Sequence, residues 1–202
     1  MNILNHNNFI FIGDSLTFGY GVNKNKCWIE ILRDSILSSS INLNIINKGI
    51  NGNTTTDMLN RFTEDVIKLN PYTVFIMGGT NDLLSNRHLS LILDNIELMI
   101  KEAQTKTNNI IIGIPPRIVK EDAYRLFMPS STYDYCENTL PILRDKLIKL
   151  CESYKVKYID FYNLTANLNQ KEIYLDGIHL NENGHKILFE SFIKMLDLDI
   201  NK

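Results

Sequence analysis

Four short stretches of this 202-residue chain carry the groups that acyl transfer requires. Such a reaction uses a hydroxyl nucleophile, a neutral imidazole that takes its proton, a carboxylate that fixes the imidazole tautomer, and N–H donors for the oxyanion. The chain offers a serine after an apolar run, a glycine between two asparagines, an asparagine after two glycines, and a paired aspartate and histidine: Ser15, Gly52, Asn81, Asp176 and His179. Together these residue types predict a serine hydrolase.

The aspartate–histidine pair is the most specific of these features. Asp176 and His179 are three residues apart, so a turn can bring the carboxylate against the imidazole. Of the four histidines in the chain, only His179 has an aspartate three residues before it, in a segment expected to form a turn, and His185 is expected to be exposed to solvent on the last helix. Gly52 lets the backbone approach a reacting centre, and Asn81 supplies a side-chain amide.

Each of these polar residues also has a structural interpretation. A serine that follows a strand often lies in a turn or caps a helix, and an asparagine after two glycines can close a turn. Asp14, beside the serine, is expected to cap a helix or hold its loop, and Asp82 is expected to be a structural partner for its own loop. The functional interpretation therefore requires that the fold bring the four stretches together.

Short apolar runs rich in β-branched and aromatic residues predict the strands that position these groups. Residues 9–12 form such a run and Gly13 ends it, which is typical of a strand buried on both faces of a parallel sheet. Comparable runs predict further strands at residues 41–46, 73–77, 109–114 and 156–161. The first three strands are followed by Ser15, Gly52 and Asn81, respectively.

Apolar residues at helical spacing predict helices between the strands. The predicted helices cover residues 27–37, 58–69, 89–103 and 140–154, and a final helix begins after Asn181. Residues 54–57 supply N-terminal capping groups, and Pro71 ends the second helix. Pro141 must lie in the first turn of its helix or kink it, and residues 117–132 are expected to be irregular or partly helical.

This alternation predicts the α/β fold class. Five strands alternating with helices indicate right-handed βαβ units and a parallel sheet with helices on both faces. No linker, repeat or low-complexity segment interrupts the chain, which predicts a single domain over residues 1–202. A doubly wound, flavodoxin-like three-layer fold with strand order 2-1-3-4-5 suits the pattern, and its ligands bind at the carboxyl ends of the strands.

Composition argues against several other classes of protein. Hydrophobic residues make up 44% and charged residues 22% of the chain, as in ordinary globular domains. A net charge of −2 offers no electrostatic surface for nucleic acid, and no apolar run is long enough to cross a membrane. The three cysteines are expected to be buried, reduced thiols, and the N-terminus shows no signal peptide, so a cytoplasmic location is expected.

The four stretches resemble the sequence blocks of the GDSL, or SGNH, family of esterases and lipases. The signature motif stands in full at residues 13–16 and extends to Thr17. The family's second block matches residues 47–52, its third block residues 79–82 and its fifth block residues 176–179. Because the blocks occur in the family's order and the resemblance covers essentially the whole chain, it is more specific than any single motif.

The resemblance implies a role for each residue. Ser15 would be the nucleophile, His179 the general base and acid, and Asp176 the carboxylate that orients the imidazole. The oxyanion hole would consist of the backbone N–H groups of Ser15 and Gly52 and the side chain of Asn81. The resemblance further implies a five-stranded SGNH-hydrolase fold, a small-molecule ester as substrate, and no cofactor or metal.

Several alternatives compete with an esterase that cleaves a small or short-chain acyl ester through an acyl-enzyme. The same triad would serve a carbohydrate acetylesterase, a lysophospholipase or a thioesterase, and acyl transfer to an alcohol stays open. A flavodoxin-like binding module would explain the fold without catalysis. An α/β-hydrolase would need glycine in place of Thr17, and a phosphatase using Asp14 would need a second carboxylate in place of Leu16.

The segment 115–133 is expected to shape the substrate pocket, because it follows the fourth strand at the same edge of the sheet. Phe127, Met128 and Tyr133 are candidates to line an acyl or alcohol site, with ordinary packing under a long connection as the alternative. The modest length of the chain argues against an elaborate lid and favours a small, accessible ester. The sequence predicts no oligomeric state.

Overall fold

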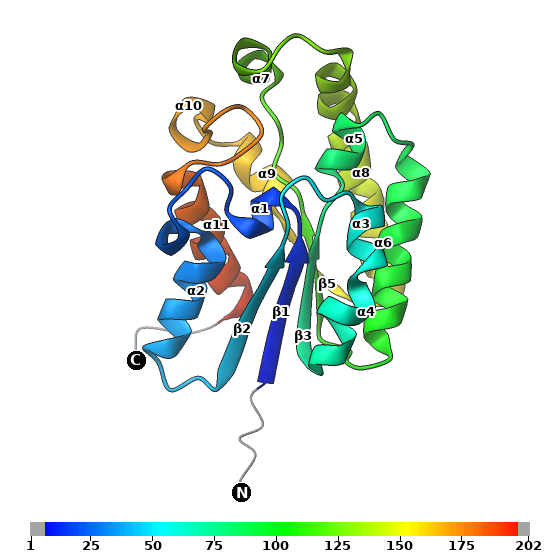
Figure 1. The fold of residues 1–202 in the computed structure, drawn as a ribbon, viewed down its shortest axis with the longest axis vertical. Coiled ribbons are helices and arrows are strands. Elements are labelled where there is room, and N and C mark those ends of the chain that lie inside the picture. Colours follow the sequence, from blue (N-terminus) through cyan, green and yellow to red (C-terminus); the bar gives the residue numbers. More distant parts are fainter. Residues whose placement is uncertain (1–6, 198–202) are drawn as a thin grey trace, which may run out of the picture.

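Five parallel strands form the central sheet of the computed structural model, which describes residues 7–197 (Figure 1). The strands are β1 (Asn7–Gly13), β2 (Leu43–Gly49), β3 (Pro71–Met77), β4 (Ile110–Ile114) and β5 (Lys157–Asp160). Their order across the sheet is β2-β1-β3-β4-β5, and every neighbouring pair is parallel. The fold class and strand order predicted from the sequence are therefore confirmed.

Helices cover both faces of this sheet (Figure 1). One face carries α2 (Trp28–Leu37) and α11 (Glu182–Leu196), and the other carries α3 (Thr55–Asn60), α4 (Phe62–Asp65), α6 (Leu89–Gln104) and α8 (Ser131–Tyr154). The other α-helices are α1 (Ser15–Phe18), α5 (Thr80–Leu84), α7 (Lys120–Leu126), α9 (Phe161–Ala166) and α10 (Gln170–Ile173), and two 3₁₀ turns are η1 (Lys24–Lys26) and η2 (Ile67–Leu69). At the carboxyl edge of the sheet, the top of Figure 1, lie α1, α5 and α7.

The central strand β1 divides the core into two layers. Ile10 and Ile12 pack on one face against α3, α6 and α8, whereas Phe9 and Phe11 pack on the other against α2 and α11. On the second face four aromatic residues form a cluster: Phe11, Trp28, Phe75 and Phe192. The ring centroids of every pair in this cluster are 5.2–5.6 Å apart. Burial on both faces explains the continuous apolar run of this strand.

The single helix predicted over residues 58–69 is wrong in detail. The chain forms α3, α4 and η2 instead, because the backbone leaves the helical region at Arg61 (φ −106°, ψ 3°) and again at Val66 (φ −123°, ψ −63°). The apolar stripe survives these breaks, since Met58, Phe62 and Val66 are fully buried. Periodicity alone therefore did not reveal the interruptions.

The helix predicted over residues 140–154 begins earlier than expected. It starts at Ser131, so Pro141 lies in the helix interior and the first-turn interpretation is wrong. The N-terminal turns are mostly polar, and Ser130 caps them by accepting a hydrogen bond from the Thr132 N–H. An apolar stripe cannot mark such turns. The partly helical character expected for residues 117–132 is confirmed by α7.

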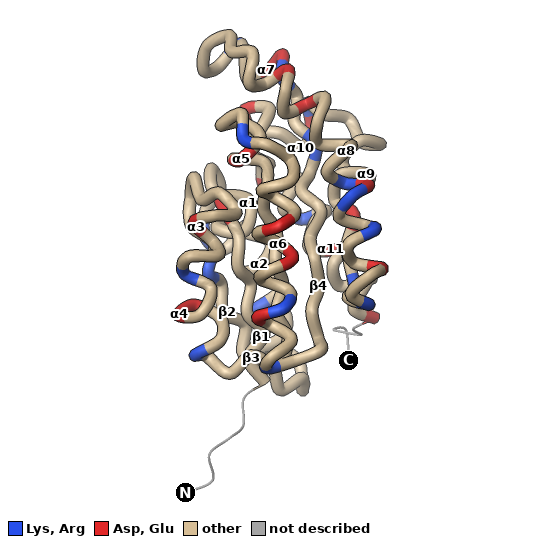
Figure 2. Tube along the Cα trace, turned by 90° about the vertical axis from the view of Figure 1, so that its right-hand side faces the viewer, with Lys and Arg blue, Asp and Glu red and all other residues tan. Residues whose placement is uncertain are grey.

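The distribution of charged residues and the state of the cysteines are those of an ordinary globular protein. Lysine, arginine, aspartate and glutamate are interspersed along the outer helices (Figure 2), consistent with the net charge of −2. All three cysteines are buried and free, as predicted. Within residues 7–197, no helix combines the length and apolar character needed to cross a membrane.

Candidate active site

The carboxyl ends of β1, β2 and β3 lie side by side. Gly13 at the end of β1 is paired with Gly49 of β2 and with Met77 of β3. Each strand leads into a segment that contains one predicted site residue: Ser15, Gly52 and Asn81, respectively. The strand order thus gathers three of the four predicted stretches at one edge.

The fourth stretch reaches the same edge through His179. Its Nε2 lies 3.0 Å from Ser15 Oγ, and its Nδ1 lies 2.7 Å from Asp176 Oδ2. Ser15 is 6% exposed, Asp176 is 7% exposed and the side chain of His179 is 16% exposed, so the three groups are largely shielded from solvent. The structure therefore brings Ser15, His179 and Asp176 into one continuous hydrogen-bonded series.

The protonation of this series follows from Asp176. Burial raises the pKa of its carboxyl, but hydrogen bonds from the side chain and backbone of His179, together with the Ile178 N–H, hold it below the ordinary value of 3.8. An ionised carboxylate only accepts hydrogen bonds, so Nδ1 of His179 must donate to it. In the neutral ring Nε2 is then the acceptor, and it can take the proton of the Ser15 hydroxyl.

A single turn holds the aspartate and the histidine. Asp176 Oδ1 accepts hydrogen bonds from the backbone N–H groups of Ile178, at 2.9 Å, and His179, at 2.7 Å. Gly177 within the turn has a φ of 85°, and a Cβ added there would lie 2.4 Å from the carbonyl oxygen of Val119. Only glycine fits this position without displacing the backbone before α7.

Asp14 caps the helix that Ser15 begins. Its Oδ1 accepts a hydrogen bond from the Leu16 N–H at 2.9 Å, and the residue is 1% exposed. Burial raises the pKa of Asp14 from 3.8 to about 6, although the Leu16 hydrogen bond and the charge of His179 oppose the shift. The capping role predicted for this residue is confirmed.

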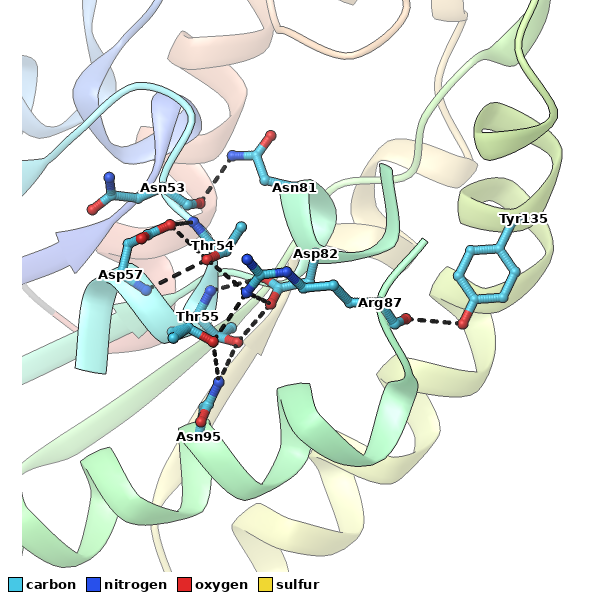
Figure 3. Close-up of polar contacts among 10 residues, drawn as sticks. Asn53, Thr54, Thr55, Asp57, Asn81, Asp82, Arg87, Asn95 and Tyr135 are labelled. Carbon is cyan, nitrogen blue, oxygen red and sulfur yellow. Dashed lines mark hydrogen bonds and ion pairs between the residues drawn. The ribbon is translucent and has the colours of Figure 1, made fainter. Parts of the chain in front are cut away.

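The segments after β2 and β3 contact each other directly (Figure 3). The side-chain amide of Asn81 donates to the carbonyl oxygen of Asn53 at 3.0 Å. Gly52, the preceding residue, has a φ of 78°, and an added Cβ would meet nothing within 4 Å. Glycine is therefore favoured there by its backbone conformation and not by crowding.

Asp82 fixes the start of α3 from below this contact (Figure 3). The carboxylate is fully buried and accepts hydrogen bonds from both the N–H and the hydroxyl of Thr55, each at 2.8 Å. Asn95 of α6 donates to Thr55 Oγ1 at 3.0 Å, and Arg87 Nη1 lies 3.8 Å from Asp82 Oδ1. Burial raises the pKa of Asp82, opposed by the Thr55 hydrogen bonds and the charge of Arg87. Asp82 is a structural partner for its loop, as predicted.

Tyr20 borders the site without belonging to any predicted motif. Its ring lies against the ring of His179, with centroids 4.4 Å apart and planes inclined by 44°. It is 43% exposed and lies between Gly19 and Gly21, whose φ values are 91° and 83°. An aromatic residue between two glycines shortly after the serine is the sequence signal that marks it.

The expectation that His185 is solvated is wrong. The residue is 1% exposed, and its Nδ1 accepts a hydrogen bond from the Trp28 N–H at 3.4 Å. This polar position of α11 faces the start of α2, where it pairs with a backbone donor that has no partner within its own helix. Burial lowers the pKa of His185 from 6.5 to about 4, so the buried ring is neutral at pH 7.

Comparison with known proteins identifies the family. The sequence model that describes the GDSL-like lipase/acylhydrolase family matches residues 11–187 of this chain. The chain belongs to this family. An acetylxylan esterase of Geobacillus stearothermophilus is 24% identical over 98% of both chains. An arylesterase of Vibrio mimicus is 31% identical, over 55% of this chain and 57% of that relative, so the chain spans little more than half of its length.

The fold is shared with solved structures of the GDSL family. A member of the lipolytic G-D-S-L family from Veillonella parvula has a TM-score of 0.77 and 24% identity, with 94% of this chain and 98% of that chain covered. The resemblance, the fold and the enzyme class predicted from the sequence, a GDSL-type ester hydrolase, are confirmed. Family membership argues against the flavodoxin-like binding module. Within residues 7–197, no group of three or more His, Cys, Asp or Glu residues is arranged to hold a metal ion.

Proposed function

We propose that this GDSL-family protein hydrolyses a small or short-chain carboxylic ester through an acyl-enzyme on Ser15. The observation that carries the proposal is the series of contacts from Asp176 Oδ2 through the His179 ring to Ser15 Oγ, at 2.7 and 3.0 Å. Ser15 is the proposed nucleophile, His179 the general base and acid, and Asp176 the carboxylate that orients the imidazole.

The reaction proceeds in two half-reactions. Ser15 Oγ forms a bond to the carbonyl carbon of the ester while its proton passes to Nε2 of His179. Collapse of the tetrahedral intermediate breaks the bond to the alcohol oxygen, which takes that proton. Water then attacks the acyl-enzyme, gives a proton to His179 and releases the carboxylic acid as Ser15 regains its proton. The ionised Asp176 stabilises the imidazolium in both halves.

The proposed oxyanion hole consists of the N–H groups of Ser15 and Gly52 and the side chain of Asn81. An amide nitrogen carries two N–H bonds, and Asn81 uses one of them on the carbonyl oxygen of Asn53. The other is available to the oxyanion. Because the contact with Asn53 limits rotation of the amide, the donor is oriented before the substrate binds, as electrostatic stabilisation requires.

Exposed apolar side chains favour a small apolar acyl group or an aromatic alcohol. They lie within a few residues of Ser15, Gly52 or Asp176, and each is 43–51% exposed: Phe18, Tyr20, Ile50 and Leu175. Ligand sites that take such groups are lined mostly by apolar and aromatic side chains with a few polar groups that fix orientation. These side chains stand on short segments, which is consistent with an accessible ester.

Removal of acetyl groups from a carbohydrate is the second candidate. It is supported by the acetylxylan esterase of Geobacillus stearothermophilus, which aligns with 98% of this chain. The ring of Tyr20, partly exposed beside His179, offers a face against which a sugar ring can stack. Lysophospholipase and thioesterase activities use the same proposed triad and are included in the test below.

The test is a hydrolysis screen with matched serine variants. Wild type, Ser15→Ala and Ser153→Ala are assayed on p-nitrophenyl esters of two to twelve carbons, acetylated xylo-oligosaccharides, a lysophospholipid and an acyl thioester. Ser153 lies exposed at the end of α8, so its variant should match wild type. Ser15→Ala should lose about 10⁴-fold or more in kcat and should not react with a fluorophosphonate probe. Retention of a tenth of wild-type kcat by Ser15→Ala would contradict the proposal.

We also propose that residues 1–202 form one SGNH-type domain, since the two core layers draw residues from β1 through α11. A single cooperative unfolding transition seen by both calorimetry and circular dichroism is the expected result. A cytoplasmic location stays a prediction, and fractionation of cells that produce the protein tests it.

A further inference from the structure

Arg61 connects three segments that meet at the candidate site. Its Nη2 donates to the carbonyl oxygen of Gly13 at 3.0 Å, and its Nε donates to Asn53 Oδ1 at 2.8 Å. Its Nη1 forms an ion pair with Asp65 Oδ2 at 2.8 Å. The side chain is 16% exposed, so these bonds lie in a mostly desolvated environment.

The partners of Arg61 are close in sequence to the proposed catalytic groups. Gly13 ends β1 two residues before Ser15, and Asn53 follows Gly52 directly. The carbonyl oxygen of Asn53 in turn accepts the hydrogen bond from Asn81. A continuous path of hydrogen bonds therefore runs from the segment of the nucleophile, through the guanidinium and Asn53, to the proposed side-chain donor of the oxyanion hole.

We propose that Arg61 is a positioning residue that fixes the distance between Ser15 and the oxyanion donors Gly52 and Asn81. This inference rests on the proposed function. A donor stabilises the oxyanion only when it lies where the negative charge develops, and a displacement of about 1 Å costs on the order of 10²-fold in rate. Arg61 holds the nucleophile segment and the donor segment through one planar, rigid group.

Ion pairing alone does not account for this arrangement. Asp65 Oδ1 also pairs with Lys48 at 2.9 Å, so its charge keeps a cationic partner if Arg61 is replaced. The pKa of Asp65 lies below its ordinary value because hydrogen bonds from Arg61 and Lys48 outweigh the effect of burial. Asp65 anchors one nitrogen of the guanidinium, which directs the other two toward Gly13 and Asn53.

Three variants separate positioning from general support of the fold. Arg61→Met removes the bonds to Gly13 and Asn53, and Arg61→Lys keeps the charge with a single donor group. Lys48→Met is the matched control, because it removes a cation from the same Asp65 and leaves the bonds of Arg61 to Gly13 and Asn53 in place. Each variant is assayed for kcat and KM on p-nitrophenyl acetate, for the second-order rate of fluorophosphonate labelling, and for its melting temperature.

We expect Arg61→Met to lower kcat and the labelling rate by about 10- to 100-fold with KM changed less than about threefold. Arg61→Lys should recover part of this loss, and Lys48→Met should stay within about twofold of wild type in kcat. Combined with Asn81→Ala, Arg61→Met should lower kcat by much less than the product of the two single effects, because both act on the same donor.

Three outcomes would overturn the inference. Arg61 would have only a structural role if correctly folded Arg61→Met kept the kcat of wild type. The same would follow if Lys48→Met lost as much kcat as Arg61→Met, or if the losses of kcat in the double variant were fully multiplicative. If Arg61→Met does not fold, Asn53→Ala decides, since it removes one acceptor of Arg61 and keeps the carbonyl that binds Asn81. Asn53→Ala should lower kcat about threefold or more, and an unchanged kcat would overturn the inference. Failure of wild type to hydrolyse any ester would instead overturn the proposed function, and this inference with it.

Discussion

The two sides of Ser15 are built in different ways. On the base side, Asp176 and His179 come from one turn, whose hydrogen bonds join residues two or three positions apart. On the oxyanion side, the segments after β2 and β3 are joined by bonds between residues 27 or 28 positions apart, and Arg61 reaches Gly13 across 48 positions. The base side is a local structure, whereas the oxyanion side exists only in the assembled sheet.

This difference has consequences for mutations. A local turn can form its internal bonds without the rest of the site, so its substitutions should change the chemistry and leave most of the fold intact. The oxyanion side uses its bonds both to orient donors and to connect strands, including the buried Asp82–Thr55 contact. Its substitutions should therefore lower kcat and thermal stability together. The predictions below test this contrast, beginning with the largest expected effect.

Removal of the imidazole should have the largest effect on kcat. His179→Ala should lose about 10⁴- to 10⁶-fold, and the double variant with Ser15→Ala should be little worse, because the pair acts as a unit. Asp176→Asn should lose about 10⁴-fold, since an amide no longer enforces the Nδ1–H tautomer. His88→Ala, at the exposed start of α6, is the control and should keep near-normal kcat. A large loss of melting temperature in His179→Ala would contradict the local character of the base side.

Loss of the Asn81 amide should have the next largest effect. Asn81→Ala should lower kcat by about 10²- to 10³-fold with KM little changed, because the proposed donor acts mainly in the transition state. It should also lower the melting temperature, since the bond to Asn53 joins two strand ends. Asn60→Ala, at the exposed end of α3, is the control. An unaltered kcat would mean that the oxyanion hole uses backbone amides alone.

Sequence predicted the base side more completely than the oxyanion side, for the same physical reason. The spacing of Asp176 and His179 already implies contact in a turn, and the apolar runs imply the strands that precede Ser15 and Asn81. The Asn81–Asn53 and Arg61–Gly13 bonds depend on strand order and register, which no local pattern encodes. The burial of His185 was likewise invisible, because its partner Trp28 lies 157 positions away. Nothing in the apolar stripe of Met58, Phe62 and Val66 marks the break between α3 and α4.

His185, in the helix that follows the base side, makes a long-range contact with α2, and acid should reveal it. Its pKa is about 4 in the folded protein against 6.5 ordinarily, owing to burial first and the charge of His179 second. The unfolded chain therefore binds the proton more readily. The lowered pKa of His185 contributes about 3 kcal/mol to the free energy of unfolding. This contribution is fully present above pH 6.5 and is lost as the pH drops to 4.

His185→Asn tests this, since the Oδ1 of asparagine takes the place of the imidazole Nδ1 and can still accept from the Trp28 N–H but does not titrate. Asp14 acts in the opposite direction, because its pKa is raised to about 6 and protonation of its buried carboxyl favours the folded state as the pH falls. The difference between wild type and variant in urea unfolding at pH 7.5 and pH 4 isolates the histidine. The variant should lose about 3 kcal/mol less than wild type over this interval, and equal losses would contradict the buried neutral ring.

The smallest effect is expected at the tip of the segment that follows β4. This segment touches the base side, since the Val119 N–H donates to the carbonyl oxygen of Gly177 at 2.7 Å, whereas Phe127 and Met128 beyond α7 are 48% and 76% exposed. Exposed side chains contribute little to stability, so Phe127→Ala and Met128→Ala should leave the melting temperature nearly unchanged. If they meet the substrate, kcat/KM for long acyl esters relative to acetate should fall by about three- to tenfold, as expected for lost apolar contacts. Leu37→Ala is the control, because Leu37 is 74% exposed at the end of α2, at the opposite edge of the sheet. An unchanged chain-length preference would leave Phe18, Tyr20, Ile50 and Leu175, the exposed apolar residues nearest in sequence to the proposed catalytic groups, as the candidates for substrate recognition.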